Sequence, residues 1–366
     1  MSDLLDFKCP HCGGKLEFDA AVQKMKCPYC DSELDIEALQ KNEEILAEVG
    51  KEDSISFDES AGQEWEQGET DGMNVYSCNS CGGEIVADDT TGATHCPYCG
   101  NPVVMTAKFA GALKPDYIIP FSITKEQAKD ALKKHYKGKK YLPRVFSDDN
   151  HLDEIKGLYV PFWLFDGKAD ASINYKMSNT RVWEDRNFMY TETSHFSGYR
   201  KGSVSFKRVP VDGASKMPDE MMESVEPFDS SAAVPFKTAY LSGFLADKYD
   251  IDDKECIRRA TERIKKTTAD AFAGTVSGYA SVGVQDSHIE LSDSKASYAL
   301  YPVWLLTTSF EGKQYLFAVN GQTGKIVGDL LVDNSLLKKD KLLWTFVFGA
   351  AAYAVLYILG TLGGML

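Results

Sequence analysis

The chain has 366 residues, of which 54 are acidic and 40 basic, giving a formal net charge of −14 at pH 7. This acidic balance excludes bulk electrostatic attraction to nucleic acid. Hydrophobic residues make up 43% and aromatic residues 11%, which is enough for at least one core and excludes a wholly disordered chain. The nine cysteines are too few for a disulfide-dense secreted scaffold, and the start, MSDLLDFKCP, lacks the basic and apolar regions of a cleaved secretion signal.

Eight of the nine cysteines form four C-x-x-C pairs. Fourteen residues separate the two pairs in each half, so both halves read C-x2-C-x14-C-x2-C. Two residues between thiolates allow a tight turn, here called a knuckle, that directs both sulfurs at one metal ion, and four thiolates favour tetrahedral zinc. We therefore predict two structural zinc ions in two zinc ribbons, at residues 1–34 and 75–110. The predicted ligands are Cys9, Cys12, Cys27 and Cys30 in ribbon 1, and Cys78, Cys81, Cys96 and Cys99 in ribbon 2.

The two ribbons are internal copies of each other. Outside the cysteines, their alignment matches a Gly-Gly pair, an aspartate and a Pro-Tyr pair in each half. A glycine directly after the second cysteine of a knuckle can adopt the positive φ angle that such a turn needs. The matched residues are Gly13-Gly14 with Gly82-Gly83, Asp19 with Asp88, and Pro28-Tyr29 with Pro97-Tyr98.

Two other kinds of cysteine site are weaker alternatives. A redox C-x-x-C centre needs only one pair in a βαβ setting, and an iron–sulfur cluster usually has less hairpin-like cysteine spacing. His11 and His95 lie beside the cysteines, but with four thiolates present we expect them to be surface residues of the knuckles. A site closed by four protein ligands also has no open position for catalysis.

The negative charge is concentrated between the ribbons. Residues 31–71 hold fifteen acidic side chains against two lysines, a local charge of −13. We interpret residues 35–74 as an acidic helix and a disordered linker, because residues 32–50 have the apolar spacing of a short helix whereas residues 51–72 have few apolar groups and no period. Two interpretations are open for Phe57 and Trp65: contact with a neighbouring domain, or a short motif that docks a partner.

The charge of each ribbon bears on its partner. Ribbon 1 carries Lys8, Lys15, Lys24 and Lys26, whereas residues 76–104 of ribbon 2 contain no lysine or arginine. A phosphate-binding surface needs several cations, so we do not expect nucleic acid to be the partner of ribbon 2. We therefore expect protein partners, with a nucleic-acid-associated factor, helicase-related or transcriptional, as the alternative.

Residues 111–335 hold the main core, predicted as an α+β domain with mostly antiparallel strands. The alternating stretches typical of strands are residues 157–177, 188–210, 298–310 and 313–332, and those with helical periodicity are 123–137, 217–225 and 252–274. The likeness of residues 158–164 to residues 300–305 indicates a possible internal duplication. The segment has no recognised nucleotide-binding, nucleophile-elbow or metalloprotease motif, so no catalytic residue is predicted, and we expect Cys256 to be a small buried residue.

Residues 342–366 contain no charged side chain. As a helix this run is about 37 Å long, against a hydrocarbon core of about 30 Å. Lys338, Lys339 and Lys341 precede it, and the positive-inside bias leaves the bulk of the chain in the cytoplasm. The sequence thus predicts that residues 336–366 are a basic flank and a single-pass transmembrane tail anchor in the cell membrane; a buried core helix is the alternative. The Gly/Ala-rich faces of the span are suited to packing against a membrane-protein partner.

The ribbons, together with the strings YIIPFSITKEQAKDALKKHYKG, EIKGLYVPFWLFDG and FAVNGQTGKIVGDL, resemble a family of Gram-positive bacterial membrane proteins. Its members are described as transcription factor IIB-type zinc-ribbon-containing proteins and often labelled primosomal protein N′ helicases, although this chain has no nucleotide-binding motor motif. The chain is also similar to the tail-anchored double-zinc-ribbon protein encoded beside SPFH (flotillin-like) and phage-shock-protein-A-like proteins. This resemblance implies a non-enzymatic adaptor that recruits those cytosolic partners to the membrane during envelope stress, with the eight cysteines as metal ligands.

Overall fold

A computed structural model of the chain describes residues 8–10, 14–20, 22–41, 53–57, 61–109 and 112–363, with side chains in the last helix described as far as residue 355. The chain forms two compact units. Unit 1 comprises Met1–Ala61, Trp163–Val211 and Asp253–Ser297, and unit 2 comprises Gly62–Phe162, Asp212–Asp252 and Tyr298–Leu366. The units differ from the linear segments predicted from the sequence, because three long strands each contribute residues to both units.

Ribbon 1 belongs to unit 1. Three short strands among its described residues form an antiparallel sheet in the order β1-β2-β3. The bounds are β1 (Glu17–Asp19), β2 (Lys24–Lys26) and β3 (Glu33–Leu34). The buried residues of its core are Cys9, Leu16, Cys27 and Leu39. Leu39 comes from a helix at residues 36–41, the described part of the predicted acidic helix; residues 42–52 lie outside the described residues.

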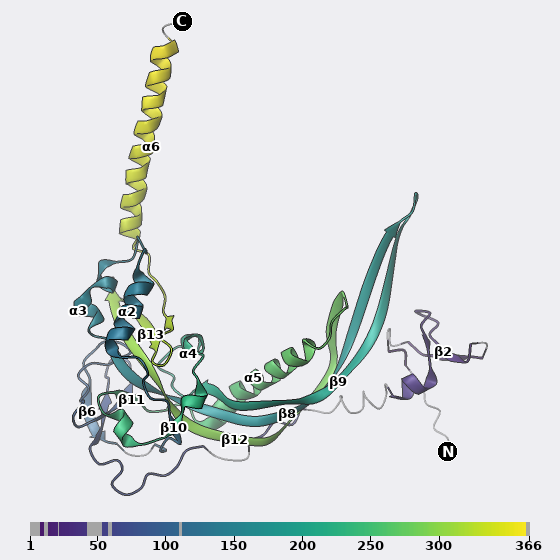
Figure 1. Ribbon diagram of the computed structural model, residues 1–366, viewed down its shortest axis with the longest axis horizontal. Helices are drawn as coiled ribbons and strands as arrows, with labels where there is room; N and C mark the ends of the chain where they lie inside the picture. The colour runs from purple at the N-terminus through teal and green to yellow at the C-terminus, as the bar shows by residue number, and fades with distance from the viewer. Residues whose placement is uncertain are drawn as a thin grey trace. The chain divides into compact units, whose positions relative to one another are not determined.

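The remainder of unit 1 consists mainly of long strands covered by one helix (Figure 1). The bounds are β8 (Lys156–Glu184), β9 (Met189–Asp212), β12 (Ser281–Phe310) and α5 (Asp253–Ala273). The helix buries Cys256, Ala260 and Ile264 on one face. Ile264 packs in a cluster with Ile173 and Tyr175 of β8. This is the face that the helical periodicity of residues 252–274 predicts.

Unit 2 is organised by a mixed sheet with the strand order β10-β7-β12-β8-β11-β5-β4-β6, to which β13 and β14 are added beside β12. The bounds of these strands are β4 (Met73–Ser77), β5 (Glu84–Asp88), β6 (Val104–Lys108), β7 (Tyr117–Ile118), β10 (Val234–Pro235), β11 (Leu245–Asp247), β13 (Lys313–Asn320) and β14 (Ile326–Val327). The pairs β7–β12 and β8–β11 are parallel, whereas β4, β5 and β6 pair antiparallel. Because β5 also pairs with β11, ribbon 2 is part of this sheet.

Short helices cover the sheet of unit 2. Their bounds are α2 (Lys125–Tyr136), α3 (Asp149–Leu152) and α4 (Asp219–Val225), with single 3₁₀ turns at Arg144–Ser147, Ser230–Ala232 and Thr238–Leu241. A capping box between Thr124 and Gln127 begins α2, which satisfies two of its terminal N–H groups. Leu132 of this helix packs in the core with Trp304 and Phe317.

The strand pairing in unit 2 is reciprocal. β7 precedes α2 and pairs with β12, placing Tyr117 opposite Ala299. β11 precedes α5 and pairs with β8, placing Leu245 opposite Leu158. Each short strand therefore pairs in parallel with the long strand of the other half, as expected if two copies of one β-α-β segment exchanged partners. This arrangement supports the duplication predicted from the sequence.

Residues 51–72 were expected to be disordered, but the described residues of this segment make defined contacts. In unit 1, Phe57 packs against Phe165 with ring centres 4.9 Å apart. In unit 2, Trp65 packs edge to face against Phe109 at 5.4 Å. Composition misses this order because single half-buried aromatic side chains contribute enough contact area to hold a polar segment. Both contacts favour the first interpretation of these two aromatic residues, contact with neighbouring parts of the chain.

The last helix, α6 (Asn334–Gly363), contains most of the predicted membrane span. Its large apolar side chains are exposed where they are described, for example Leu342 (59%), Phe346 (70%) and Tyr353 (72%). Within the described part of the chain, no helix meets the length and hydropathy needed to cross a membrane. The predicted span, residues 342–366, continues into residues 356–366, whose side chains lie outside the described residues.

Candidate metal centres

Ribbon 2 brings together all four of its predicted ligands. The Sγ atoms of Cys78, Cys81, Cys96 and Cys99 lie within 4.8 Å of one another. The distance is 3.5 Å between Cys78 and Cys99 and 3.6 Å between Cys81 and Cys96. Metal–sulfur bonds of about 2.3 Å in a tetrahedron require sulfur–sulfur distances of about 3.8 Å. The four sulfurs are therefore close to the spacing that a tetrahedral metal ion requires.

Backbone hydrogen bonds shape the knuckles of ribbon 2. The N–H of Cys78 donates to the carbonyl of Gly83 at 2.9 Å, and the N–H of Gly82 donates to the carbonyl of Cys78 at 2.8 Å. The second knuckle repeats both hydrogen bonds around Cys96, at 2.8 and 3.0 Å. Gly82 and Gly100, the residues after the second cysteines, have φ angles of +70° and +71°. These positions explain the glycines, because a side chain at such an angle is strained.

Burial and backbone donors act in opposite directions on the thiols of ribbon 2. Burial raises the pKa of Cys96 and of Cys81. At Cys78 burial also acts to raise the pKa, but hydrogen bonds from the backbone of Cys81 and Ser80 outweigh it and lower the pKa to about 7. Metal binding must displace the remaining thiol protons, so metal affinity increases with pH.

Ribbon 1 brings together three of its predicted ligands, Cys9, Cys27 and Cys30. The Sγ atoms of Cys9 and Cys30 are 3.6 Å apart. The predicted fourth ligand, Cys12, lies outside the described residues. Cys9 and Cys27 are buried, whereas Cys30 is exposed. The described residues therefore form two clusters that can hold metal ions, and Cys30 makes the one in ribbon 1 more open to solvent.

The second knuckle of ribbon 1 has the same backbone shape without the glycine. The N–H of Cys27 donates to the carbonyl of Ser32, and the N–H of Asp31 donates to the carbonyl of Cys27, both at 2.9 Å. Asp31 occupies the left-handed position with a φ of +56°. Aspartate tolerates this conformation better than most residues. A search for glycines after the second cysteine does not find this left-handed position, because ribbon 1 has Asp31 there. The only sequence signal for it is its spacing from Cys27.

Ribbon 2 is fixed to the sheet of unit 2 by a strand and by a buried side-chain pair. Val86 pairs with Ala246 and Ile85 with Asp247 across β5 and β11. The hydroxyl of Tyr98 donates a hydrogen bond to the carboxyl of Asp247, and both residues are buried. Burial raises the pKa of Asp247 to about 7, although the bond from Tyr98 acts to lower it. This carboxyl therefore carries its proton far above the usual pH range of an aspartate.

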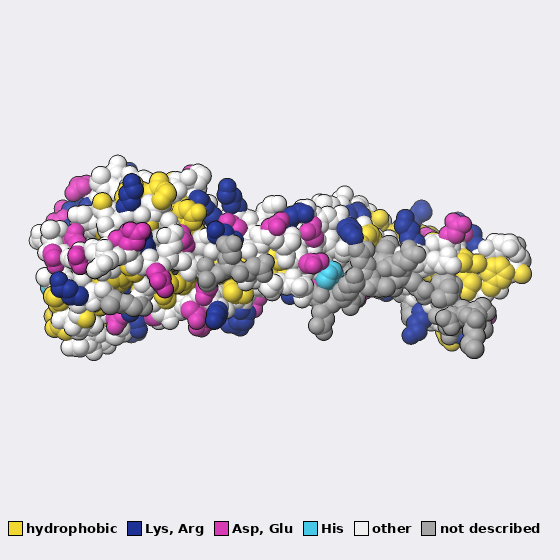
Figure 2. Space-filling view, turned by 90° about the horizontal axis from the view of Figure 1, so that it is seen from below, with side chains coloured by type: hydrophobic (Ala, Val, Ile, Leu, Met, Phe, Trp, Pro, Cys, Tyr) yellow, Lys and Arg dark blue, Asp and Glu magenta, His cyan; other side chains and the backbone are white. Residues whose placement is uncertain are grey.

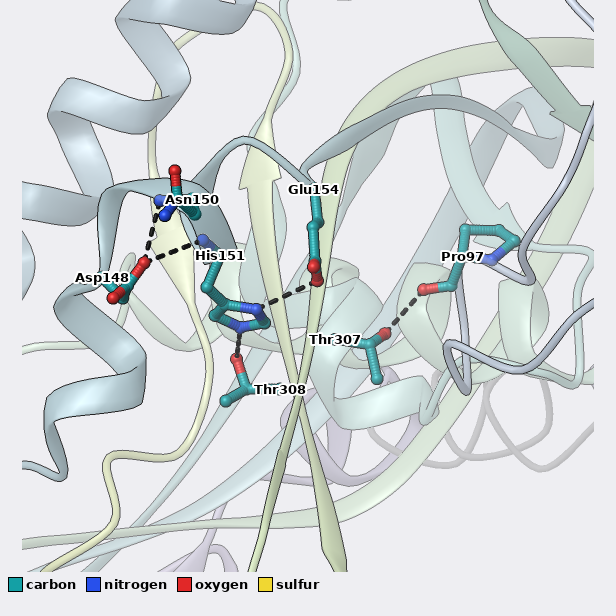
Figure 3. Close-up of polar contacts among 7 residues, drawn as sticks. All are labelled: Pro97, Asp148, Asn150, His151, Glu154, Thr307 and Thr308. Atoms are coloured by element: carbon teal, nitrogen blue, oxygen red, sulfur yellow. Dashed lines mark hydrogen bonds and ion pairs between the residues drawn. The ribbon is translucent and has the colours of Figure 1, made fainter.

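Side chains of unit 2 also donate to backbone carbonyls of the knuckle, and Figure 3 shows the contact between Thr307 and Pro97. Thr307 lies 2.7 Å from the carbonyl of Pro97, whereas the adjacent Thr308 bonds to His151. We call the residues that contact the knuckle the knuckle seat. The contacts are Thr307 to Pro97 (2.7 Å) and Tyr98 (3.1 Å), Gln314 to Cys99 (2.7 Å), Lys156 to His95 (2.9 Å), and Asp247 to the hydroxyl of Tyr98.

A cavity of about 400 Å³ lies beside this knuckle, with His95, Glu154, Lys156 and Thr307 in its lining. Lys156 and Thr307 already donate to knuckle carbonyls. Glu154 is bound to His151 at 3.0 Å, and the other ring nitrogen of His151 lies 2.7 Å from Thr308 (Figure 3). The polar groups around this cavity are thus engaged in holding the knuckle and α3 in place.

Comparison with known proteins shows a family relationship over most of the chain. The chain is 34% identical over 325 residues to the uncharacterized protein YdjG of Bacillus subtilis strain 168, and the match covers 89% of each chain. The chain belongs to the YdjG family. No protein-family model matches it, and no solved structure matches it. The name of YdjG states no activity, ligand or partner.

Proposed function

We propose that the chain is a non-enzymatic, membrane-anchored adaptor in which ribbon 1 binds a cytosolic protein and unit 2 is the scaffold. The observation that carries this proposal is the different setting of the two ribbons. Ribbon 2 is part of the sheet of unit 2, whereas the described strands of ribbon 1 pair only with each other. Ribbon 1 exposes the large apolar side chains of Phe18 (51%), Val22 (45%) and Ile36 (39%), and Figure 2 shows hydrophobic side chains on its surface at the right of the view. Exposed apolar groups gathered on a small module favour protein contact.

The ion proposed for both clusters is zinc. A four-thiolate set is the usual structural zinc site, and it survives in a reducing compartment. Two of the buried residues described in the ribbon 1 core, Cys9 and Cys27, are also proposed metal ligands, so the binding energy of the ion is expected to contribute to the folding of the ribbon. Loss of zinc is therefore expected to unfold ribbon 1 and to abolish partner binding.

Membrane attachment is proposed to come from residues 342–366. The uncharged run is long enough to reach across a bilayer, and attachment would cover the apolar side chains that α6 exposes. Fractionation of cells that express the full chain tests this. The full chain is expected to remain with membranes after a high-salt wash, and a chain ending at residue 341 is expected to be in the soluble fraction. A full chain in the soluble fraction, or a truncated chain still with the membranes, contradicts the anchor.

The proposed partners are the cytosolic SPFH (flotillin-like) and phage-shock-protein-A-like proteins that the family resemblance implies. The test is binding of each purified candidate to the immobilised, zinc-loaded full chain. Cys27→Ser is expected to abolish binding because it removes a ligand from ribbon 1, whereas Cys256→Ala, which changes a cysteine outside both clusters, is the matched control. Binding that survives Cys27→Ser contradicts a role for ribbon 1. Steeply salt-dependent DNA binding by the full chain would instead support the nucleic-acid alternative.

A further inference from the structure

The same tetrapeptide, Cys-Pro-Tyr-Cys, forms the second knuckle of both ribbons, at residues 27–30 and 96–99. The two copies differ in exposure. Tyr98 of ribbon 2 is 7% exposed, whereas Tyr29 of ribbon 1 is 76% exposed. Pro97 and Cys99 are buried as well, and the matching residues of ribbon 1 are exposed. One copy is therefore docked within its own unit and the other presents the same sequence to solvent.

The two knuckles share a backbone conformation, so they present the same groups. The N–H of the first cysteine donates to the carbonyl five residues later at 2.9 Å in ribbon 1 and 2.8 Å in ribbon 2. The residue after the second cysteine has a positive φ in both, +56° at Asp31 and +71° at Gly100. The docked copy thus shows which chemistry this surface accepts: a buried carboxyl for the tyrosine hydroxyl and side-chain donors for the carbonyls.

We propose that the Cys27–Cys30 knuckle is the docking surface of ribbon 1, and that its partner is a protein with an equivalent of the knuckle seat. That partner offers an aspartate or glutamate that accepts a hydrogen bond from the hydroxyl of Tyr29. It also offers hydroxyl, amide or ammonium donors to the carbonyls of Pro28, Tyr29 and Cys30. The inference rests on the proposed adaptor function and identifies the surface and partner chemistry through which ribbon 1 acts.

The docked ribbon also has one contact that lies outside the knuckle seat. In ribbon 2, β5 pairs with β11 of unit 2 at Val86. The matching residue of ribbon 1 is Glu17, which pairs with Lys26 of β2 within the ribbon itself. The β5–β11 pairing is not part of the knuckle seat, so the proposed complex is confined to the contacts of the knuckle and includes no strand addition. The complex is expected to be weaker and more reversible than the intramolecular one.

A second copy of this chain is not the occupant that the structure favours. The knuckle seat of unit 2 is already filled by Tyr98 and its neighbours from the same chain. Ribbon 2 is part of the same chain as that seat, so its knuckle is present there at a high effective concentration. Ribbon 1 of another molecule would have to displace it from solution and is at a disadvantage. A different protein that carries an unfilled seat is therefore the proposed partner.

The test compares zinc-loaded full chains, immobilised and exposed to a cytosolic extract of the source cells, with retained proteins quantified by mass spectrometry. The variants are Tyr29→Ala, Tyr29→Phe and, as a control, Glu17→Ala, which removes an exposed side chain elsewhere on ribbon 1. A protein retained by the parent and by Glu17→Ala should be lost with Tyr29→Ala. With that protein purified, Tyr29→Phe should weaken binding about tenfold to hundredfold, since it removes one hydrogen bond to a carboxylate. Replacing the partner's carboxylate by its amide should then add little to the effect of Tyr29→Phe, as expected for interacting groups.

The outcomes separate this inference from the adaptor function. Zinc content near two ions per chain in each Tyr29 variant shows that the ribbons are intact. A partner retained equally by Tyr29→Ala and the parent overturns the knuckle proposal and leaves the adaptor function standing. Retention of another copy of the chain overturns the proposed partner. If the parent retains no protein, the adaptor function and the knuckle proposal both fail.

Discussion

Replacing Asp247 by asparagine should change how the stability of unit 2 depends on pH. Asp247 is buried at the contact between β11 and ribbon 2, and burial raises its pKa from 3.8 to about 7. Between these two values the folded chain holds a proton that the unfolded chain has lost. Stability therefore falls as pH rises through this window, because the folded state must either keep the proton or bury a charge.

The size of the effect follows from the two pKa values of Asp247. Across the full window, the titration of Asp247 lowers the free energy of unfolding by about 4 kcal/mol. Between pH 5 and pH 7 it lowers this free energy by about 2 kcal/mol. Asparagine does not titrate, and its side-chain oxygen still accepts the hydrogen bond from Tyr98. The free energy of unfolding of Asp247→Asn, measured relative to that of the parent, should thus increase by about 2 kcal/mol between pH 5 and pH 7. The thiol groups titrate in both proteins, so their contribution cancels in the difference.

Hydrogen-exchange protection of β5 and β11 measures this difference in the zinc-loaded full chain, because protection factors report the local free energy of opening. The control is Asp130→Asn, which makes the same substitution at an exposed position of α2 in the same unit. A difference between Asp247→Asn and the parent that is the same at pH 5 and pH 7 would refute the reasoning. It would mean that Asp247 is already ionised at pH 5 and that the contact is hydrated.

Three further predictions concern the metal sites. A chelator should remove metal from ribbon 1 faster than from ribbon 2, since Cys30 is exposed; equal rates in stopped-flow chelation contradict this. Lys156→Met should increase the rate of metal release from ribbon 2 severalfold, because it removes the donor to the carbonyl of His95. Lys156→Arg should restore part of the parent rate. An unchanged rate with Lys156→Met shows that this donor does not hold the knuckle. In urea denaturation, Gly82→Ala should cost about 1–2 kcal/mol because its φ is +70°, whereas Asp31→Gly should not destabilise; equal losses in both variants refute the backbone argument.

The sequence predicts the two cysteine clusters well, because metal ligation imposes a spacing that is visible without the fold. Seven of the eight predicted ligands fall into the two clusters, and Cys12 lies outside the described residues. The spacing does not reveal which ribbon is docked. That difference depends on Asp247, Thr307 and Gln314, which are distant in sequence and ordinary in type.

The main sheet is predictable in its long elements and not in its short ones. The strand patterns of residues 157–177 and 298–310 lie within β8 and β12, and the helical periodicity of residues 252–274 matches α5. β11 has only three residues, too few for a periodic signal. Because this short strand joins ribbon 2 to β8, the sequence separates a ribbon and a core that the structure unites in one sheet.

The central claim is that two zinc ions hold the two ribbons, and metal analysis of the purified full chain tests it most directly. The parent and the control Cys256→Ala should each contain two zinc ions per chain, and Cys27→Ser and Cys78→Ser should each contain one. Iron with the absorbance of an iron–sulfur cluster, or a parent chain with no more than one zinc ion, would contradict the account.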